Sequence, residues 1–377
     1  MRLLHLSDTH LGFRHLTRIV REGGEFAGLN QREVDVYMAW RWAVDLAIER
    51  GVDVVVHAGD LFDSPRPTNR ALVEALQGIR RLDGAGIPFV VVAGNHSTPR
   101  LRQTGSVFRV LEQLTGVHAF YRGYGRSTVG DVTFHGIPHT YDDAAKGEWL
   151  SRLTRDPEAT RNVAVIHCAV PGITGHFAEI SQMTVEDGSL PADFDYVALG
   201  HVHRYHVVRP NAVYSGSLEP LNFGEHGETK GAVIVDLDTG RREFVPRETR
   251  PFLSETIDCT RRGYADIEAE AAGVIESAPA GAMLRLVLDN VLRSEFRSLD
   301  IRGLRARGGH LLHLEIAHRL ADETVSTTGA TSFGDLTVEF EAFLADRSLD
   351  AADRDALLAL GREILLEVRG ESGVKGG

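Results

Sequence analysis

The chain has 377 residues, of which 43% are hydrophobic and 25% are charged, and its formal net charge is −12. This length predicts two or more domains, and the composition is that of a globular protein. The negative charge argues against a general nucleic-acid coat, because phosphate binding depends on Lys and Arg, but a local basic groove stays possible. Cys168 and Cys259 are the only cysteines, which excludes a disulfide framework and a cysteine-rich zinc motif. Without a signal-peptide pattern or a membrane-length apolar run, we expect a reducing, cytoplasmic setting and no membrane partner.

The first part of the chain alternates apolar strands with helices. Strands are predicted over residues 2–8, 52–60 and 87–96. Helices are predicted over residues 34–50 and 68–82, the second capped by Thr68. Near-continuous apolar strands joined by helices predict an α/β fold with a sheet buried on both faces. Shorter β-rich segments follow, up to a hairpin around residues 238–240, so the first domain is expected to span residues 1–248.

The rest of the chain divides into three predicted segments. Residues 249–320 predict a small α+β unit with strands over 252–258, 283–289 and 311–318. Residues 321–334 are polar and of low complexity, which is typical of a linker. Residues 335–377 predict two helices with apolar faces. Because an apolar helix pair after a linker needs a surface to cover, this last segment favours docking on a partner.

Metal-type ligands stand at the end of five predicted strands. They are Asp8, His10, Asp60, Asn95, His96, His167, His201 and His203. Sites in open α/β sheets form at the carboxyl ends of strands, so these side chains are expected at one rim. Oxygen and imidazole ligands without thiolate suit Mn²⁺, Fe or Zn²⁺. They are too many for one ion, and two ions about 3.5–4 Å apart fit the two-metal cleavage of phosphate esters.

Other polar residues have simpler interpretations, because a lone histidine is more often a hydrogen-bonded structural residue than a ligand. His5, His57, His135 and His139 are interpreted in this way, Cys168 as a small buried residue, and Asp63 as a residue that shapes its loop. His176 and His206 lie near His167 in the sequence and compete with it for the ligand role.

The motifs DxH, GDxxD, GNH, a lone H and GHxH occur in this order between Asp8 and His203. They resemble the calcineurin-like metallophosphoesterase superfamily. The segments DTHLGFRH, QREVDVYMAW and YSGSLEPLNFGE resemble more closely its DNA double-strand-break repair branch, the bacterial SbcD-type exonuclease subunit. This resemblance implies a β-sandwich flanked by helices over residues 1–248, followed by a capping domain and C-terminal helices. It also implies a homodimer through the nuclease domain and docking of residues 335–377 on an SMC-like ATPase.

The resemblance also implies a role for each site residue. One ion would be bound by Asp8, His10, Asp60 and His203. The other would be bound by Asp60, Asn95, His167 and His201, with Asp60 as the bridge. His96 would lie near the scissile phosphate and stabilise or protonate the leaving oxygen, and the nucleophile would be a metal-activated water.

One position departs from the family pattern. The third motif usually reads GNHD, whereas this chain reads GNHS over residues 94–97. An acid there could orient the His96 ring and raise its basicity, which Ser97 cannot do as a charge. Either another carboxylate supports His96, or the protein works with a weaker acid.

These features predict a Mn²⁺-dependent DNA exonuclease or endonuclease that works with an SMC-like ATPase, since the chain has no phosphate loop of its own. Loop arginines could form a groove for the DNA backbone, or could be ordinary solvated charges. They are Arg14, Arg18, Arg21, Arg66, Arg100 and Arg102. Two alternatives remain: an enzyme of the same superfamily that acts on a small phosphodiester or a phosphoprotein, and a non-catalytic DNA-tethering subunit, for which Ser97 is the only support.

Overall fold

The computed structural model describes most of the chain, namely residues 1–15, 19–20, 24–99, 105–173, 183–321, 357–358 and 360–361. The chain divides into two compact units, Met1–Arg319 and Leu320–Gly377. The account below concerns the first unit. The predicted linker and C-terminal helices lie outside the described residues, apart from Ala321 and four helical residues between 357 and 361.

The first sheet has six strands in the order β12-β11-β1-β2-β3-β4. Its parallel strands are β1 (Arg2–Leu6), β2 (Val54–His57), β3 (Phe89–Val92) and β4 (Val117–Phe120). The hairpin of β11 (Gly231–Asp236) and β12 (Arg241–Pro246) adds to β1 in antiparallel fashion. The parallel strands are mostly apolar, with His5 and His57 as buried exceptions, because both faces of this sheet are covered.

One face of the first sheet packs against helices α1 (Gln31–Glu49) and α2 (Asn69–Gly84), through a core that contains Trp40 and Phe89. Thr68 caps α2, as predicted, because its side chain accepts a hydrogen bond from the backbone of Ala71. Helix α1 begins earlier than expected, since Asn30 caps it by accepting from the Arg32 backbone N–H. The short helix α3 (Phe108–Leu111) joins the same core.

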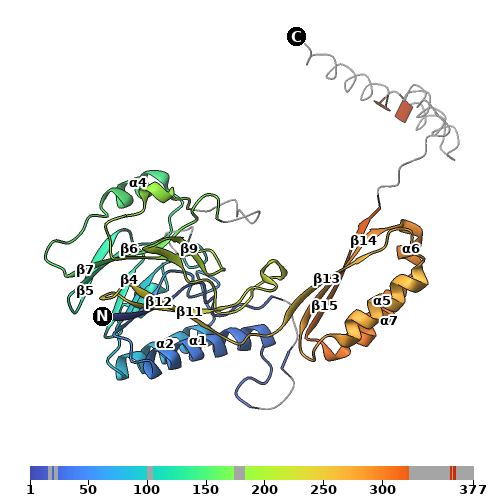
Figure 1. The fold of residues 1–377 in the computed structure, drawn as a ribbon, viewed down its shortest axis with the longest axis horizontal. Helices are drawn as coiled ribbons and strands as arrows, with labels where there is room; N and C mark the ends of the chain where they lie inside the picture. Colours follow the sequence, from blue (N-terminus) through green and yellow to red (C-terminus); the bar gives the residue numbers. More distant parts are fainter. Residues whose placement is uncertain are drawn as a thin grey trace, which may run out of the picture. The chain divides into compact units, whose positions relative to one another are not determined.

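The second sheet also has six strands, in the order β5-β6-β7-β8-β10-β9. They are β5 (Gly125–Val129), β6 (Val132–Ile137), β7 (Arg161–His167), β8 (Tyr196–Gly200), β9 (His206–Arg209) and β10 (Ala212–Tyr214). A core of small and β-branched residues, such as Val56, Val90 and Val163, lies between the two sheets. The outer face packs against α4 (Asp143–Ser151) through Trp149 and Leu150. The predicted β-sandwich flanked by helices is therefore confirmed (Figure 1).

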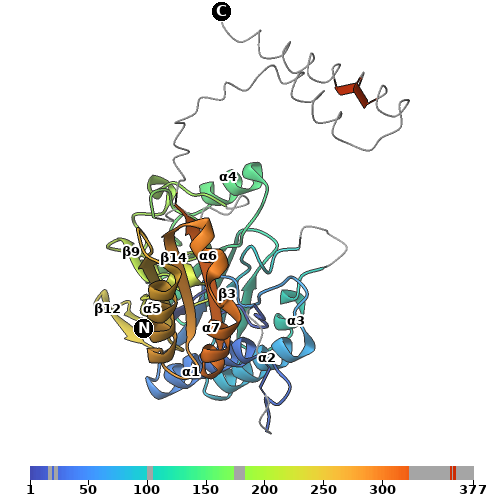
Figure 2. The same cartoon turned by 90° about the vertical axis from the view of Figure 1, so that its right-hand side faces the viewer.

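A third, smaller sheet follows, in the order β13-β14-β15. Its strands are β13 (Phe252–Asp258), β14 (Met283–Val291) and β15 (His313–Leu320). Helices α5 (Tyr264–Ser277), α6 (Arg293–Ser298) and α7 (Ile301–Arg307) accompany it, and α5 and α7 share a separate apolar core with the strands (Figure 2). The predicted domain boundary at residue 248 lies between β12 and β13, and it stays a prediction, because the first compact unit contains both parts.

Two short 3₁₀ turns, η2 (Asp187–Ser189) and η3 (Phe223–Glu225), lie in loops of the sandwich, and η4 (Gly308–His310) follows α7. Within the part of the chain that the structure describes, no helix is both long and apolar enough to cross a lipid bilayer.

Candidate metal centre

The predicted site residues are brought together where strands of two different sheets end. Asp8 and His10 follow β1, Asp60 follows β2, and Asn95 and His96 follow β3, which are neighbours in the first sheet. His167 ends β7 and His201 follows β8, which are neighbours in the second sheet. These side chains therefore lie together at one rim, which is formed by two facing sheets and not by one open sheet.

Three of the histidines are oriented by a hydrogen bond from the ring nitrogen that faces away from the centre. Nδ1 of His10 lies 3.0 Å from Asp63 Oδ1, Nδ1 of His167 donates to the carbonyl of Ala58 over 2.8 Å, and Nδ1 of His203 lies 2.9 Å from Glu225 Oε1. Because these partners are acceptors, Nδ1 carries the proton when the ring is neutral, and Nε2 is then the atom that can bind a cation. Such outer partners are typical of metal-binding histidines.

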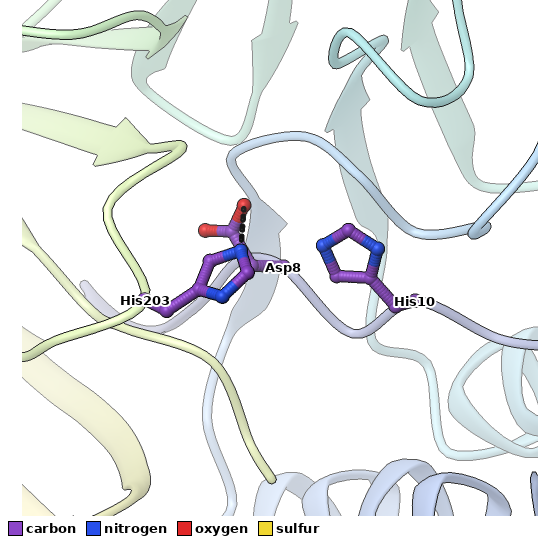
Figure 3. A group of neighbouring side chains, drawn as sticks. All are labelled: Asp8, His10 and His203. Carbon is purple, nitrogen blue, oxygen red and sulfur yellow. Dashed lines mark ion pairs between the residues drawn. The ribbon is translucent and has the colours of Figure 1, made fainter. Parts of the chain in front are cut away.

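The Nε2 atoms point toward the carboxylates. Nε2 of His203 lies 3.9 Å from Asp8 Oδ1, and Figure 3 shows this pair beside the ring of His10. Nε2 of His167 lies 3.2 Å from Asp60 Oδ2 and 2.8 Å from the side-chain oxygen of Asn95. Nε2 of His10 is buried and has no hydrogen-bond partner among the described residues.

This arrangement fits divalent cations. Three groups of side chains bring potential ligand atoms within 4.8 Å of one another. They are Asp8, His10 and His203; His10, Asp60 and His96; and Asp8, Asp60 and His167. When the rings are neutral, their Nε2 lone pairs face the negative carboxylates, and a bound cation would remove the resulting repulsion. Carboxylate, amide and imidazole donors without thiolate suit Mn²⁺, Fe or Zn²⁺.

The backbone at the site is strained. Asp8, His10, Asp60 and His201 have positive φ angles of 51°, 53°, 51° and 97°. Residues with a Cβ rarely adopt this conformation, and such outliers cluster at functional sites, where the surrounding fold maintains them. All four strained residues are among the metal ligands predicted from the sequence.

The glycines of the GD, GN and GH motifs are required because neighbouring atoms lie too close to their Cα atoms to leave room for a side chain. A Cβ on Gly59 would lie 2.2 Å from Nδ1 of His167, one on Gly94 would lie 2.3 Å from Asp60 Oδ1, and one on Gly200 would lie 2.0 Å from the carbonyl oxygen of Ala58. Each of these contacts is impossible for a side chain. The glycines therefore let the three loops pack directly against the ligand side chains.

The electrostatics keep the carboxylates ionised. Burial would raise the pKa of Asp60, but His167 and other nearby histidines outweigh it and lower that pKa far below its usual range. Burial would likewise lower the pKa of His203, but Glu225 raises it to about 9. No carboxylate among the described residues pairs with the ring of His201, and burial lowers its pKa to about 3.

Asp63 proves more important than the sequence indicated, since its carboxylate contacts His10 and its backbone carbonyl lies 3.2 Å from Nδ1 of His96. Its Oδ1 also lies 3.9 Å from that Nδ1. Ser97 is fully buried and donates to the carbonyl of Phe62 over 3.2 Å, away from the ring. The His96 ring is thus oriented by the backbone carbonyl of Asp63 and not by the residue at position 97.

Glu225 and Lys230 are the other residues that sequence reasoning missed. Both are buried, and Nζ of Lys230 lies 2.6 Å from Glu225 Oε2 and donates to the carbonyl of His203 over 2.7 Å. Glu225 lies within the segment YSGSLEPLNFGE, which served only as a mark of resemblance. The available signal was Lys230, one of only three lysines in the sequence, which follows Glu225 by five residues.

The remaining candidates lie elsewhere or are not described. The ring of His5 lies 2.9 Å from the Tyr196 hydroxyl, and that of His57 lies 2.8 Å from the hydroxyl of Thr9, so both have structural partners as predicted. His206 begins β9 at the edge of the second sheet. His176 and the loop arginines 18, 21, 100 and 102 lie outside the described residues. Of the other loop arginines, Arg14 pairs with Glu33 at 3.3 Å.

Comparison with known proteins agrees with this geometry. The DNA double-strand break repair protein Mre11 of Sulfurisphaera tokodaii is 32% identical over 244 residues, which cover 62% of this chain and 59% of that protein. The protein of the same name from Methanopyrus kandleri is 33% identical over 280 residues, covering 67% of this chain and 58% of the relative. The matches thus leave about two fifths of these relatives uncovered. A family model described as calcineurin-like phosphoesterase matches residues 1–205, which contain every predicted ligand. The chain therefore belongs to the calcineurin-like phosphoesterase family of metal-dependent phosphoesterases.

Proposed function

We propose that this protein is a Mn²⁺-dependent DNA nuclease that acts on double-strand ends as the nuclease subunit of a DNA repair complex. The observation that carries the proposal is the convergence of imidazole nitrogens on two buried carboxylates, Asp8 and Asp60, at the facing edges of two sheets. The similarity to proteins named for DNA double-strand break repair supports DNA as the substrate.

The ligands divide into two sets around Asp60. In this proposal Asp8, His10, Asp60 and His203 would hold one ion, and Asp60, Asn95, His167 and His201 would hold the other. Bound there, the two ions would polarise the scissile phosphate and activate a water for in-line attack. The chain's own contribution is to hold these side chains in place, through Asp63, Ala58 and Glu225 behind three of the rings.

His96 is suited to the proton transfer. Its backbone N–H donates to Asp60 Oδ1 over 2.9 Å, which ties the residue to the centre. Its Nδ1 donates to the Asp63 carbonyl, which leaves Nε2 as the atom that holds or releases a proton. At Nε2, a protonated ring would donate to the leaving oxygen of the DNA strand, and general acid catalysis of this kind contributes about 10²–10⁴-fold.

The partners belong to the proposal as well. We expect DNA to bind along loops near the centre, where Arg14 and Arg66 are exposed. An SMC-like ATPase would dock on residues 335–377, and a second copy of the chain would pair through the sandwich. We also propose that the protein is located in the cytoplasm.

The test is cleavage of end-labelled linear double-stranded DNA by the purified chain, with Mn²⁺ or with a chelator, beside the variant His96→Ala. We expect cleavage that requires Mn²⁺ and that falls by about 10²-fold or more in the variant. Hydrolysis of a small chromogenic phosphodiester is measured in parallel. If the small phosphodiester is hydrolysed and the DNA stays intact, the protein is a small-molecule phosphodiesterase and not a nuclease. Bound metal without either reaction would favour a tethering subunit.

A further inference from the structure

The turn η3 connects the candidate metal centre with the third sheet. Glu225, its last residue, accepts the hydrogen bond from Nδ1 of His203 over 2.9 Å. Phe223, its first residue, is 4% exposed and packs in an apolar cluster with Phe252 and Met283. The two side chains are only two residues apart, and they contact structures that are formed by distant parts of the chain.

Glu225 is held firmly at the metal side. Its Oε1 accepts from the side chain of Asn222 over 2.8 Å, and its Oε2 accepts from the backbone of Leu221 over 3.2 Å. Lys230 pairs with Oε2 and also donates to the carbonyl of His203. Because both carboxylate oxygens are engaged in a buried setting, the carboxylate cannot rotate without losing several bonds. The same network therefore fixes the ring and the backbone of His203.

Phe223 is held equally firmly at the other side. It packs against Phe252, the first residue of β13, with ring centroids 5.4 Å apart. Met283 and His313 are the first residues of β14 and β15, and both lie beside the same ring. The guanidinium of Arg285 stands 4.9 Å from the centroid of that ring. The beginnings of all three strands of the third sheet thus meet at Phe223.

We propose that η3 couples the position of the third sheet to the metal centre, with Glu225 as a positioning residue that acts through His203. The packing of Phe223 against the third sheet fixes the position of Glu225, and Glu225 keeps Nε2 of His203 directed at Asp8. A shift of the third sheet would move η3 as a unit and turn this ring. This proposal rests on the proposed metal centre, in which His203 is a ligand. It adds the link from that ligand through η3 to the third sheet.

The first test replaces the positioning group alone. Glu225→Gln keeps the size of the side chain but removes its charge, and Lys230 keeps Glu228 as an ionic partner at 2.8 Å. We expect Mn²⁺ affinity to fall by about 10–100-fold, the usual effect of losing an outer partner of a ligand. Affinity is measured on the metal-free full chain from the electron paramagnetic resonance signal of free Mn²⁺, which does not depend on catalysis.

The second test begins at the third sheet and uses two adjacent residues of β14. Met283 and Leu284 are both fully buried, but Met283 packs in the Phe223 cluster and Leu284 in the separate core with α5. We expect Met283→Ala to weaken Mn²⁺ binding by roughly 3- to 10-fold. This effect is smaller than that of Glu225→Gln, because the outer partner is displaced and not removed. Leu284→Ala serves as the control: it removes a similar apolar volume and leaves the affinity unchanged. Phe223→Leu, which keeps an apolar side chain, provides a second variant if Met283→Ala fails to fold.

The outcomes separate the inference from the proposed function. Unchanged Mn²⁺ affinity in Glu225→Gln would overturn the positioning role, and equal affinities in Met283→Ala and Leu284→Ala would overturn the coupling. A wild-type chain that binds no Mn²⁺ would overturn the metal centre itself, and this inference with it. Failure of the wild type to cleave DNA would overturn the nuclease proposal and leave the coupling standing, because the titration contains no DNA.

Discussion

Histidines lie in the strand interiors and beyond the strand ends of the sandwich, and their surroundings make them different chemical groups. His5 and His57 lie inside β1 and β2, and burial among apolar strands lowers the pKa of each to about 3. His203 lies beyond a strand end, where Glu225 overcomes the effect of burial and raises its pKa to about 9. The comparison shows that a carboxylate within hydrogen-bond reach can outweigh burial and keep a histidine basic.

The largest effect is expected from the bridging carboxylate at the strand ends. Asp60→Asn removes the charge that both proposed ions share, so hydrolysis of a small phosphodiester should fall by about 10³-fold or more. Wild-type protein at Mn²⁺ concentrations of about 100 times its Kd should gain about 2.7 kcal/mol in its free energy of unfolding, and the variant much less. Steady-state kinetics and thermal unfolding with and without Mn²⁺ measure the two effects.

The control for that variant is Glu74→Gln, which changes a buried carboxylate that pairs with Arg41, remote from the strand ends. It should alter stability and leave Mn²⁺ binding as in the wild type. Comparable loss of Mn²⁺ binding in both variants would contradict the assignment of Asp60.

A smaller effect is expected from the acid behind His10. Asp63→Ala removes the acceptor of Nδ1, so the ring loses its orientation, and Mn²⁺ affinity should fall by about 10–100-fold. Asp45→Ala, at an exposed carboxylate that pairs with Arg81, is the control and should bind Mn²⁺ as the wild type does. Titration with Mn²⁺ decides the matter, and an unchanged affinity in Asp63→Ala would show that Asp63 only shapes its loop.

The strand interior should respond in stability alone. His5→Phe leaves the buried hydroxyl of Tyr196 without its partner, which costs about 1–3 kcal/mol in the free energy of unfolding. Mn²⁺ affinity should not change, because His5 contributes no atom to the ligand groups. Urea unfolding of the metal-free chain measures the change in the free energy of unfolding. A weakened Mn²⁺ affinity would contradict the view that His5 has only a structural role.

The smallest effect is expected at the position where the chain departs from its family. Ser97→Ala removes one hydrogen bond to the carbonyl of Phe62, worth about 0.5–1.5 kcal/mol, and no contact with the His96 ring. Phosphodiester hydrolysis should therefore stay at the wild-type rate. A clear loss of rate at unchanged stability would assign Ser97 a part in the reaction.

The sequence by itself determined which residues form the candidate site. The motif order placed an acid, an amide or an imidazole at the ends of five strands, and the apolar runs located those strands, since both signals are local. Thr68 as a helix cap and the hairpin at residues 238–240 were predictable for the same reason. Helices α6 and α7 were not predicted, because they are short and their apolar residues show no sustained period.

Only the tertiary structure decided how these residues work together. It divided the ligand-bearing strands between two facing sheets, and it brought Asp63 to His10 and Glu225 to His203 across 53 and 22 residues of sequence. It also brought Phe223 to the third sheet and imposed left-handed backbone at Asp8 and Asp60. Contacts of this kind depend on how distant segments pack, and no periodicity or propensity within a single segment encodes them.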